Sequence, residues 1–385
     1  MCKITGSWIS TAAVLASLAG AVLAGAERPR ARDLGVRFRG APGPLNAITD
    51  IAGVTVGHVT LIEGDAVRTG VTVLWPRGLD NSAPVFGGWY SLNGNGEMTG
   101  TAWIDESGFI DGPVAFTNTH SVGVVRDAII QWQVRRSRKP ATTSYGDAFW
   151  SLPVVAETYD GFLNDVNGFH VKPEHLWRAL ESARGGPVAE GNVGGGTGMV
   201  CYGFKGGIGT ASRKAGPYMV GALVQCNCGR RQQLTIAGVP VGQEIQDAVP
   251  YAAGQPGISI ERGSILIAVA SDAPLLQHQL KRLARRAAMG LARTGSTSMN
   301  GSGDLFLALS TAATGAPDST DPQSVRMLPN EAMNPLFEAT VESVEEAIVN
   351  SMVAADTLTG IQNHTVVALP HERLREAMRK WGRNP

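Results

Sequence analysis

The strongest constraint on the fold of this 385-residue chain is a pair of short, fully apolar segments joined by one amphipathic segment. Residues 264–270 and 304–310 have the length of strands and carry apolar side chains on both faces, which indicates strands buried on both sides. Residues 274–289 place leucines on one side and basic side chains on the other, as in a helix that packs on a sheet. Strands of this kind alternating with amphipathic helices predict an α/β protein.

Other segments support the same class. From Ile48 onward, short β-branched runs separated by glycine predict strands, and residues 87–100 are dense in turn residues and predict a loop. Further strands are expected at 217–227 and 235–241. Further helices are expected over 121–133, 173–183, 339–354 and 371–382.

Composition limits the classes of function. The 33 basic and 33 acidic side chains balance, so no attraction to nucleic acid or to an anionic membrane is expected. The 48 glycines are well above the usual share of roughly 7% and occur in short clusters, which predicts tight turns and loops that approach a site closely.

The first 26 residues have the pattern of a secretion signal. Lys3 provides a positive start, residues 9–23 form an apolar run, and residues 24–26 (A-G-A) provide a small-x-small cleavage site. The alternative is an uncleaved membrane anchor, but the run is short and is interrupted by polar residues. We therefore expect an exported protein, periplasmic or secreted, whose mature chain begins near residue 27.

Three cysteines remain after the predicted signal. Cys226 and Cys228 flank Asn227 on a predicted strand, so their side chains should lie on one face and that of Asn227 on the other. The sequence lacks the paired Cys/His clusters of a structural zinc site. Together with Cys201 they are predicted to be small buried residues, and no metal or organic cofactor is expected.

A candidate nucleophile lies where the first apolar strand begins. Ser264 follows Gly263 at the end of a connection with closely spaced Pro and Gly residues. Ser302 and Asp304 lie in a glycine-flanked turn at the start of the second strand. Alternation should direct the side chains of Ser302 and Asp304 the same way, so that the Ser302 hydroxyl can hydrogen-bond Ser264 while the Asp304 carboxylate orients that hydroxyl. In isolation each feature also fits an ordinary turn. No histidine-based hydrolase motif occurs in the chain.

This arrangement resembles the DmpA/BapA family, the L-aminopeptidase/D-esterase and β-peptidyl aminopeptidase type of self-processing hydrolase, over residues from about 34 to 369. The resemblance implies a four-layer αββα sandwich of the N-terminal-nucleophile-hydrolase type. It also implies cleavage between Gly263 and Ser264, giving an α chain of residues 27–263 and a β chain of residues 264–385. Ser264 would then be both N-terminus and nucleophile, with its α-amine as general base.

The resemblance also assigns roles to residues around the nucleophile. Asn227 matches an oxyanion donor, Tyr159 a tyrosine that lines the site, and Glu157 the carboxylate that binds the free amine of the substrate. Ser302 and Asp304 match the supporting pair, although some relatives have Glu in place of Asp. A small peptide, amide or ester is the implied substrate, and a homotetramer of αβ units is the implied assembly.

Other functions are weighed against this hypothesis. An endo-amidase of the nylon-oligomer hydrolase type would share the fold but would not need an amine-binding carboxylate. A related acyltransferase would usually carry Thr at the position of Ser264. A non-catalytic ligand-binding protein would remain a single chain. The glycine-rich residues 191–198 lack the order and helix of a nucleotide-binding loop and predict a tight loop near the site, with Asn192 as a possible lining residue.

Overall fold

The computed structural model describes residues 28–81, 83–137, 149–252, 263–312 and 321–383, so the predicted signal peptide lies outside it. The larger of two main sheets has the order β4-β3-β12-β11-β10-β9. Its strands β11 and β12 are parallel, and each remaining neighbouring pair is antiparallel. The strands are β3 Val85–Gly94, β4 Phe109–Ile110, β9 Gly207–Ala215, β10 Tyr218–Asn227, β11 Ser264–Ser271 and β12 Gly303–Ser310.

The second main sheet has the order β1-β2-β5-β6. Its strands are β1 Thr55–Glu63, β2 Val67–Trp75, β5 Val114–Asn118 and β6 Val154–Thr158. Two small hairpins accompany the sheets, β7 Val200–Cys201 with β8 Phe204–Lys205 and β13 Leu358–Thr359 with β14 Thr365–Val366.

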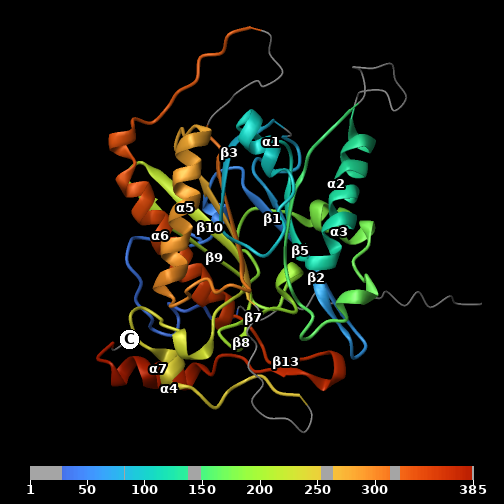
Figure 1. Ribbon diagram of the computed structural model, residues 1–385. Helices are drawn as coiled ribbons and strands as arrows, with labels where there is room; N and C mark the ends of the chain where they lie inside the picture. Colours follow the sequence, from blue (N-terminus) through green and yellow to red (C-terminus); the bar gives the residue numbers. More distant parts are fainter. Residues whose placement is uncertain (1–27, 82, 138–148, 253–262, 313–320, 384–385) are drawn as a thin grey trace, which may run out of the picture.

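Helices cover the outer face of each sheet, and Figure 1 shows the two groups on opposite sides of the molecule. The long helices α5 Gln277–Arg293 and α6 Asn334–Val353 pack on the six-stranded sheet, whereas α2 Val122–Arg136 and α3 Pro173–Ser182 pack on the four-stranded sheet. The order helix, sheet, sheet, helix confirms the predicted αββα sandwich. Shorter helices are α1 Thr101–Ser107, α4 Val241–Glu244 and α7 His371–Lys380.

Strand β11 shows how the apolar sequence determines this layering. Leu266 and Ala268 pack between the two sheets, while Ile265 and Ile267 on the opposite face pack against the helices. All eight residues of the strand are buried. Alternate residues of β11 therefore pack into two different cores, one on each face of the sheet. This explains why the sequence of the strand is apolar without interruption.

Two sequence-based predictions were wrong. Residues 87–100 were expected to form a loop, but their first part belongs to β3 inside the larger sheet. A Cβ on Gly88 would lie 2.4 Å from the Lys281 backbone nitrogen, so glycine permits α5 to pack directly on this strand. Residues 235–241 were expected to form a strand, but Ile236 and Val239 face each other in an isolated bridge of a tight turn before α4.

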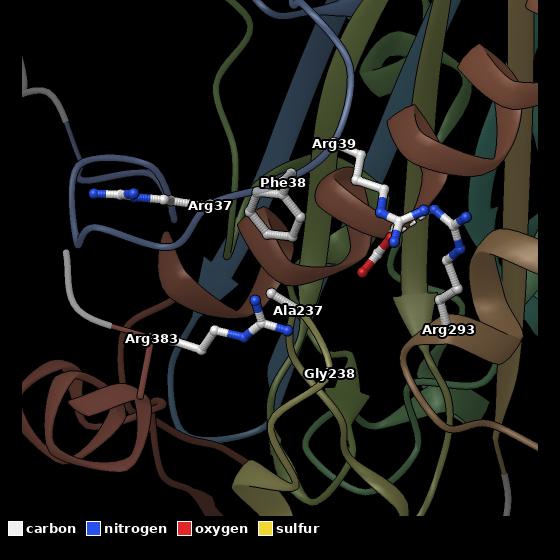
Figure 2. A pocket seen from close by; sticks show the side chains of 8 residues that line it. Arg37, Phe38, Arg39, Ala237, Gly238, Arg293 and Arg383 are labelled. Carbon is white, nitrogen blue, oxygen red and sulfur yellow. Dashed lines mark hydrogen bonds and ion pairs between the residues drawn. The ribbon is translucent and has the colours of Figure 1, made fainter. Parts of the chain in front are cut away.

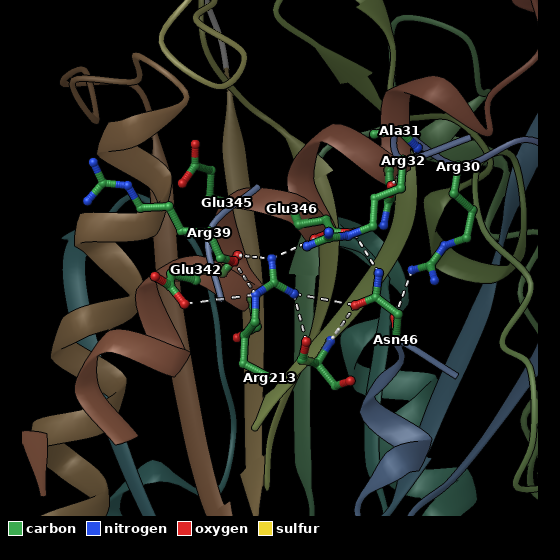
Figure 3. A network of polar contacts seen from close by, with 12 residues as sticks. Arg30, Ala31, Arg32, Arg39, Asn46, Arg213, Glu342, Glu345 and Glu346 are labelled. Atoms are coloured by element: carbon green, nitrogen blue, oxygen red, sulfur yellow. Dashed lines mark hydrogen bonds and ion pairs between the residues drawn. The ribbon is translucent and has the colours of Figure 1, made fainter. Parts of the chain in front are cut away.

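The segment that follows the predicted signal peptide is held by buried ion pairs (Figure 3). Glu346 on α6 accepts hydrogen bonds from Arg32 at 2.8 Å, from Arg213 on β9 at 2.5 Å and from the Asn46 amide at 2.5 Å. Burial would raise the pKa of Glu346, but the Arg32 hydrogen bond and the charge of Arg213 hold it below its usual value. The network joins residues 32, 46 and 213 to a helix near the C-terminus.

No helix among the described residues combines the length and apolar character needed to cross a bilayer.

Replacing the buried carboxylate should destabilise the fold strongly. In Glu346→Ala, the fully buried guanidinium of Arg213 loses its main counter-ion, which costs roughly 3–5 kcal/mol in comparable buried pairs. The control Glu372→Ala removes the largely exposed partner of Arg375 and should change stability by less than about 1 kcal/mol. Chemical denaturation followed by tryptophan fluorescence compares the two. Equal stability losses would contradict the role assigned to the network.

Candidate active site

Three strand ends bring the predicted nucleophile beside Asn227, one of its predicted partners. Ser264, the first residue of β11, pairs with Asn227 at the end of β10 and with Gly303 at the start of β12. Directly paired antiparallel residues direct their side chains to the same face. Leu223 on β10 and Leu266 on β11 pack between the sheets, so Asn227 and Ser264 face the same layer.

The backbone of β12 contacts the Ser264 hydroxyl directly. The Gly303 N–H lies 3.2 Å from Ser264 Oγ and 3.3 Å from the carbonyl oxygen of Gly263. One donor therefore serves the hydroxyl and the carbonyl of the predicted scissile bond. A Cβ on Gly303 would lie 2.3 Å from the backbone oxygen of Asn95, so this close approach requires glycine.

Ser302 and Asp304 contact each other as alternation predicted. The Ser302 hydroxyl donates to Asp304 Oδ1 at 2.6 Å, and both residues are buried. Among the described residues, Asp304 Oδ2 has no hydrogen-bond partner. Burial raises the pKa of Asp304, while the side chains of Ser302 and Ser298 and the Ile265 backbone oppose the shift. The predicted hydrogen bond from Ser302 to Ser264 does not occur in the described part of the chain, where Gly303 contacts Ser264 instead.

Asn227 is held by two backbone groups from different segments. Its Oδ1 accepts from the Val200 N–H at 2.7 Å, and its Nδ2 donates to the Tyr159 carbonyl at 3.0 Å. A backbone N–H can only donate and a carbonyl can only accept, so these partners fix the orientation of the amide. One N–H of the Nδ2 group remains without an assigned acceptor among the described residues. It is a donor on the face that carries Ser264.

Glu157 at the end of β6 is a buried carboxylate with two donors. The Glu97 N–H donates to its Oε1 at 3.1 Å and the Thr119 hydroxyl donates to its Oε2. Burial raises the pKa of Glu157 above its ordinary value, and these hydrogen bonds and His120 act in the opposite direction. No cation among the described residues forms an ion pair with it, so it can accept the charge of a ligand.

Gly96 places this carboxylate next to the nucleophile strands. A Cβ on Gly96 would lie 3.1 Å from Glu157 Oε1 and 3.4 Å from the Gly303 Cα. The carboxylate and the peptide that contacts Ser264 thus approach the same glycine from two sides. Gly96, Gly303 and Thr119 were not predicted from the sequence. The two glycines allow backbone and side-chain groups to approach closely, and Thr119 supplies one hydroxyl; no sequence motif indicates either contribution.

Tyr159 is joined to the candidate site through its backbone. Its backbone carbonyl contacts Asn227, whereas its side chain is 40% exposed and lies over Gly161. In the described residues no hydrogen bond joins its hydroxyl to Ser264. Asn192, the suggested lining residue, instead bonds the backbone of Asp356 through both ends of its amide.

The three cysteines are buried, as predicted, and lie together. Cys201 Sγ is 2.7 Å from Cys226 Sγ and 3.9 Å from Cys228 Sγ. Both Cys226 and Cys228 pack on the helix side of the larger sheet, opposite to Asn227. The predicted division of faces around Asn227 is confirmed.

A separate basic pocket of about 370 Å³ is lined by none of the predicted site residues (Figure 2). Arg37, Arg39 and Arg383 line it together with the Arg293–Glu345 ion pair. Ser264, Asn227 and Glu157 lie away from this pocket, at the ends of β11, β10 and β6. We take the place where these three residues come together as the candidate active site.

Comparisons with known proteins identify the class. The described fold matches the L-aminopeptidase D-Ala-esterase/amidase of Ochrobactrum anthropi, a protein described as a new variant of the Ntn hydrolase fold. The TM-score is 0.85 and the identity is 47%, with 93% of this chain and 100% of that one covered. The β-aminopeptidase of a Burkholderia species matches with a TM-score of 0.83 and 46% identity, with the same coverage. The protein is an aminopeptidase of this hydrolase fold.

The family follows from two further comparisons. The model of peptidase family S58 matches residues 46–366. The β-peptidyl aminopeptidase BapA of Sphingosinicella microcystinivorans is 52% identical, with 96% of this chain and 97% of that protein covered. The chain belongs to peptidase family S58.

The contact at Gly96 provides a test of the site. In Gly96→Ala, the new methyl group should displace Glu157 or the Gly303 peptide, and misplacement of about 1 Å can cost ~100-fold in rate. We expect kcat/KM on amino-acid p-nitroanilides to fall at least tenfold with unchanged thermal stability. The control is Gly94→Ala, whose added methyl would meet only Ser91 Oγ at 3.7 Å. Full activity in Gly96→Ala would contradict the geometry.

Proposed function

We propose that this chain is a self-processing serine aminopeptidase that cleaves its own Gly263–Ser264 bond. The observation that carries the proposal is the position of Ser264 Oγ, at the start of β11 beside Asn227 and within hydrogen-bond distance of the Gly303 N–H that also contacts the Gly263 carbonyl. Attack of Ser264 Oγ on the Gly263 carbonyl carbon breaks the C–N bond and forms an ester. Water then hydrolyses the ester, which leaves a Gly263 carboxylate and a free Ser264 amine.

The released amine supplies the missing base. An α-amine has an ordinary pKa of about 7.7–8, so a substantial fraction is neutral near pH 7–8. It can accept the proton of its own hydroxyl as that hydroxyl attacks a substrate carbonyl. Proton donation to the leaving amine completes acylation, and water hydrolyses the acyl-enzyme. The buried pair of Ser302 and Asp304, with the unpartnered Oδ2, provides a carboxylate for the new ammonium.

Charge develops on the substrate oxygen during both acylation and deacylation. The Asn227 side chain lies on the face that carries Ser264, and its contacts with Val200 and Tyr159 fix the orientation of its amide. A donor that is already oriented stabilises an oxyanion without reorganisation, and loss of one such donor costs about 10²–10³ in kcat. Asn227 is therefore assigned to the oxyanion.

Glu157 is assigned to the substrate amine. It is a buried carboxylate beside the nucleophile strands and forms no ion pair with the described residues, so it is suited to a single ammonium group. The substrates would be small peptides, amides or esters with a free N-terminal amine. The names of the two BapA relatives support β-peptides as one such class.

The remaining proposals concern maturation and assembly. An exported precursor would lose residues 1–26, and cleavage would give an α chain of residues 27–263 and a β chain of residues 264–385. The active form would be a homotetramer of αβ units, periplasmic or secreted, with no nucleic-acid or membrane partner. Light scattering coupled to size-exclusion chromatography tests the assembly.

Cleavage predicts a specific pattern of fragments. Denaturing electrophoresis of the purified wild type should show two fragments, and N-terminal sequencing should find Ser264 at the start of the smaller one. Ser264→Ala should remain a single inactive chain because no hydroxyl attacks the Gly263 carbonyl. An active wild type that remains uncut would refute the proposal.

Removal of the amine-binding carboxylate should affect substrates selectively. In Glu157→Gln, kcat/KM for peptides with a free N-terminus should fall about 10²-fold, since a charge-assisted contact worth roughly 1.5–3 kcal/mol is lost. N-acetylated amides are the control, and their slow hydrolysis should not change. An equal loss on both substrates would indicate an endo-amidase.

The same residue predicts a pH dependence. Because burial raises the pKa of Glu157, the carboxylate becomes neutral at a higher pH than an ordinary glutamate. KM for free-amine substrates should therefore rise as pH falls through that raised pKa, and this rise should be absent in Glu157→Gln. Measurement of KM against pH for both proteins decides this, and identical profiles would contradict it.

A further inference from the structure

Lys205 on β8 is completely buried and forms no ion pair within the described part of the chain. Its Nζ donates to the carbonyl oxygens of Met199 at 2.8 Å, Gly206 at 2.8 Å and Gly196 at 3.3 Å. An ammonium has three N–H donors and no acceptor, so three carbonyls match its protonated form. Burial of a charge costs several kcal/mol, which makes a lysine without a carboxylate partner an unusual choice for a purely structural position.

One of these contacts leads directly to the candidate active site. The Met199 carbonyl and the Val200 N–H belong to the same peptide group. The carbonyl accepts from Lys205 Nζ at 2.8 Å, and the N–H donates to Asn227 Oδ1 at 2.7 Å. A continuous series of hydrogen bonds thus runs from a buried cation through one peptide to the amide beside Ser264.

This series has two physical consequences for Asn227. A positive charge at the carbonyl end polarises the peptide, which makes its N–H a stronger donor, and hydrogen-bonded groups in series strengthen one another by roughly 10–30% per bond. The acceptor Oδ1 is polarised in turn, so the N–H groups on Nδ2 become more acidic. The donor at Oδ1 also excludes the flipped amide, in which Nδ2 would face the Val200 N–H.

We propose that Lys205 is a positioning residue for the oxyanion donor, and that its charge acts on Asn227 through the Met199–Val200 peptide. The proposal rests on the assignment of Asn227 to the oxyanion. It assigns to Lys205 a contribution that appears only when negative charge develops on the substrate oxygen. Lys205 contacts no substrate atom in this account.

The charge of Lys205 depends on pH. Burial lowers the pKa of Lys205 to about 7, with Cys201 and Cys226 opposing the shift and Arg28 adding to it, so the contribution of Lys205 to kcat should decrease as pH rises through that value. The Gly206 N–H donates to the Met199 carbonyl at 3.0 Å, so this oxygen has a second donor that holds the peptide in place when the lysine is replaced. Replacement of Lys205 by an uncharged residue should therefore leave the Met199–Val200 peptide in place.

The test is a double-mutant cycle between Lys205→Met and Asn227→Ala. Lys205→Met keeps most of the side-chain volume and removes the charge. Its kcat should fall about 10- to 100-fold, part of the 10²–10³ expected for loss of an oxyanion donor, with KM within about twofold. In the Asn227→Ala background, the same substitution should change kcat less than threefold, because the group through which it acts is absent.

Three controls separate this effect from a loss of structure. Lys214→Met, at an exposed position of β9, should keep full activity. Rates should be normalised to the cleaved fraction determined by electrophoresis, since self-cleavage needs the same oxyanion donor. A substrate-like peptide aldehyde, which forms a tetrahedral adduct with Ser264, should bind Lys205→Met at least tenfold more weakly than the wild type.

The outcomes are distinguishable. If Lys205→Met does not fold, Lys205→Gln and Lys205→Arg replace it, and only the arginine variant should retain a substantial part of kcat. Independent, additive losses in the cycle, or an unchanged kcat in Lys205→Met, would overturn the proposal. If Asn227→Ala alone has full activity, the oxyanion assignment fails and this inference fails with it, while fragment analysis still tests self-cleavage separately.

Discussion

The register of three adjacent strands is the constraint on which the site depends. Strand β11 pairs with β10 on one side and with β12 on the other, and these pairings place Asn227, Ser264 and Gly303 in one row. A shift of one residue would direct Ser264 toward the helices and would bury Ile265 between the sheets. Apolar side chains on both faces of β11 and β12 oppose such a shift, because each residue fits one of two different cores. Core packing therefore determines the geometry of the site.

Much of this arrangement could be predicted from sequence. Buried strands of 264–270 and 304–310 follow from uninterrupted apolar residues, and the contact of Ser302 with Asp304 follows from alternation. The location of Asn227 opposite the cysteine face follows in the same way. Local periodicity succeeds here because the pleat of a strand determines which side chains share a face.

The features that were wrongly predicted or missed from the sequence all depend on contacts between segments far apart in the chain. The glycines of β3 indicate a loop when read locally, yet Gly88 allows the backbone of α5 to approach a central strand. Lys205 gives no sequence signal, because its proposed role depends on carbonyl groups that come together only in the fold. The partners of Asn227 are the Val200 N–H and the Tyr159 carbonyl, and any residue other than proline at position 200 would supply the first. Hydrogen bonds from backbone groups cannot be predicted from the identity of the residues that supply them.

The same register explains why a chain cut before Ser264 would hold together. In the larger sheet, β11 and β12 of the proposed β chain lie between β3 on one side and β10 on the other, both from the proposed α chain. Helix α6 packs on β9 and β10, and Glu346 binds Arg32 and Arg213 across the same boundary. Separation of the two chains would require the loss of two strand pairings and a buried ion-pair network. Cleavage can therefore expose a new N-terminus at the centre of a sheet without loss of the fold that positions it.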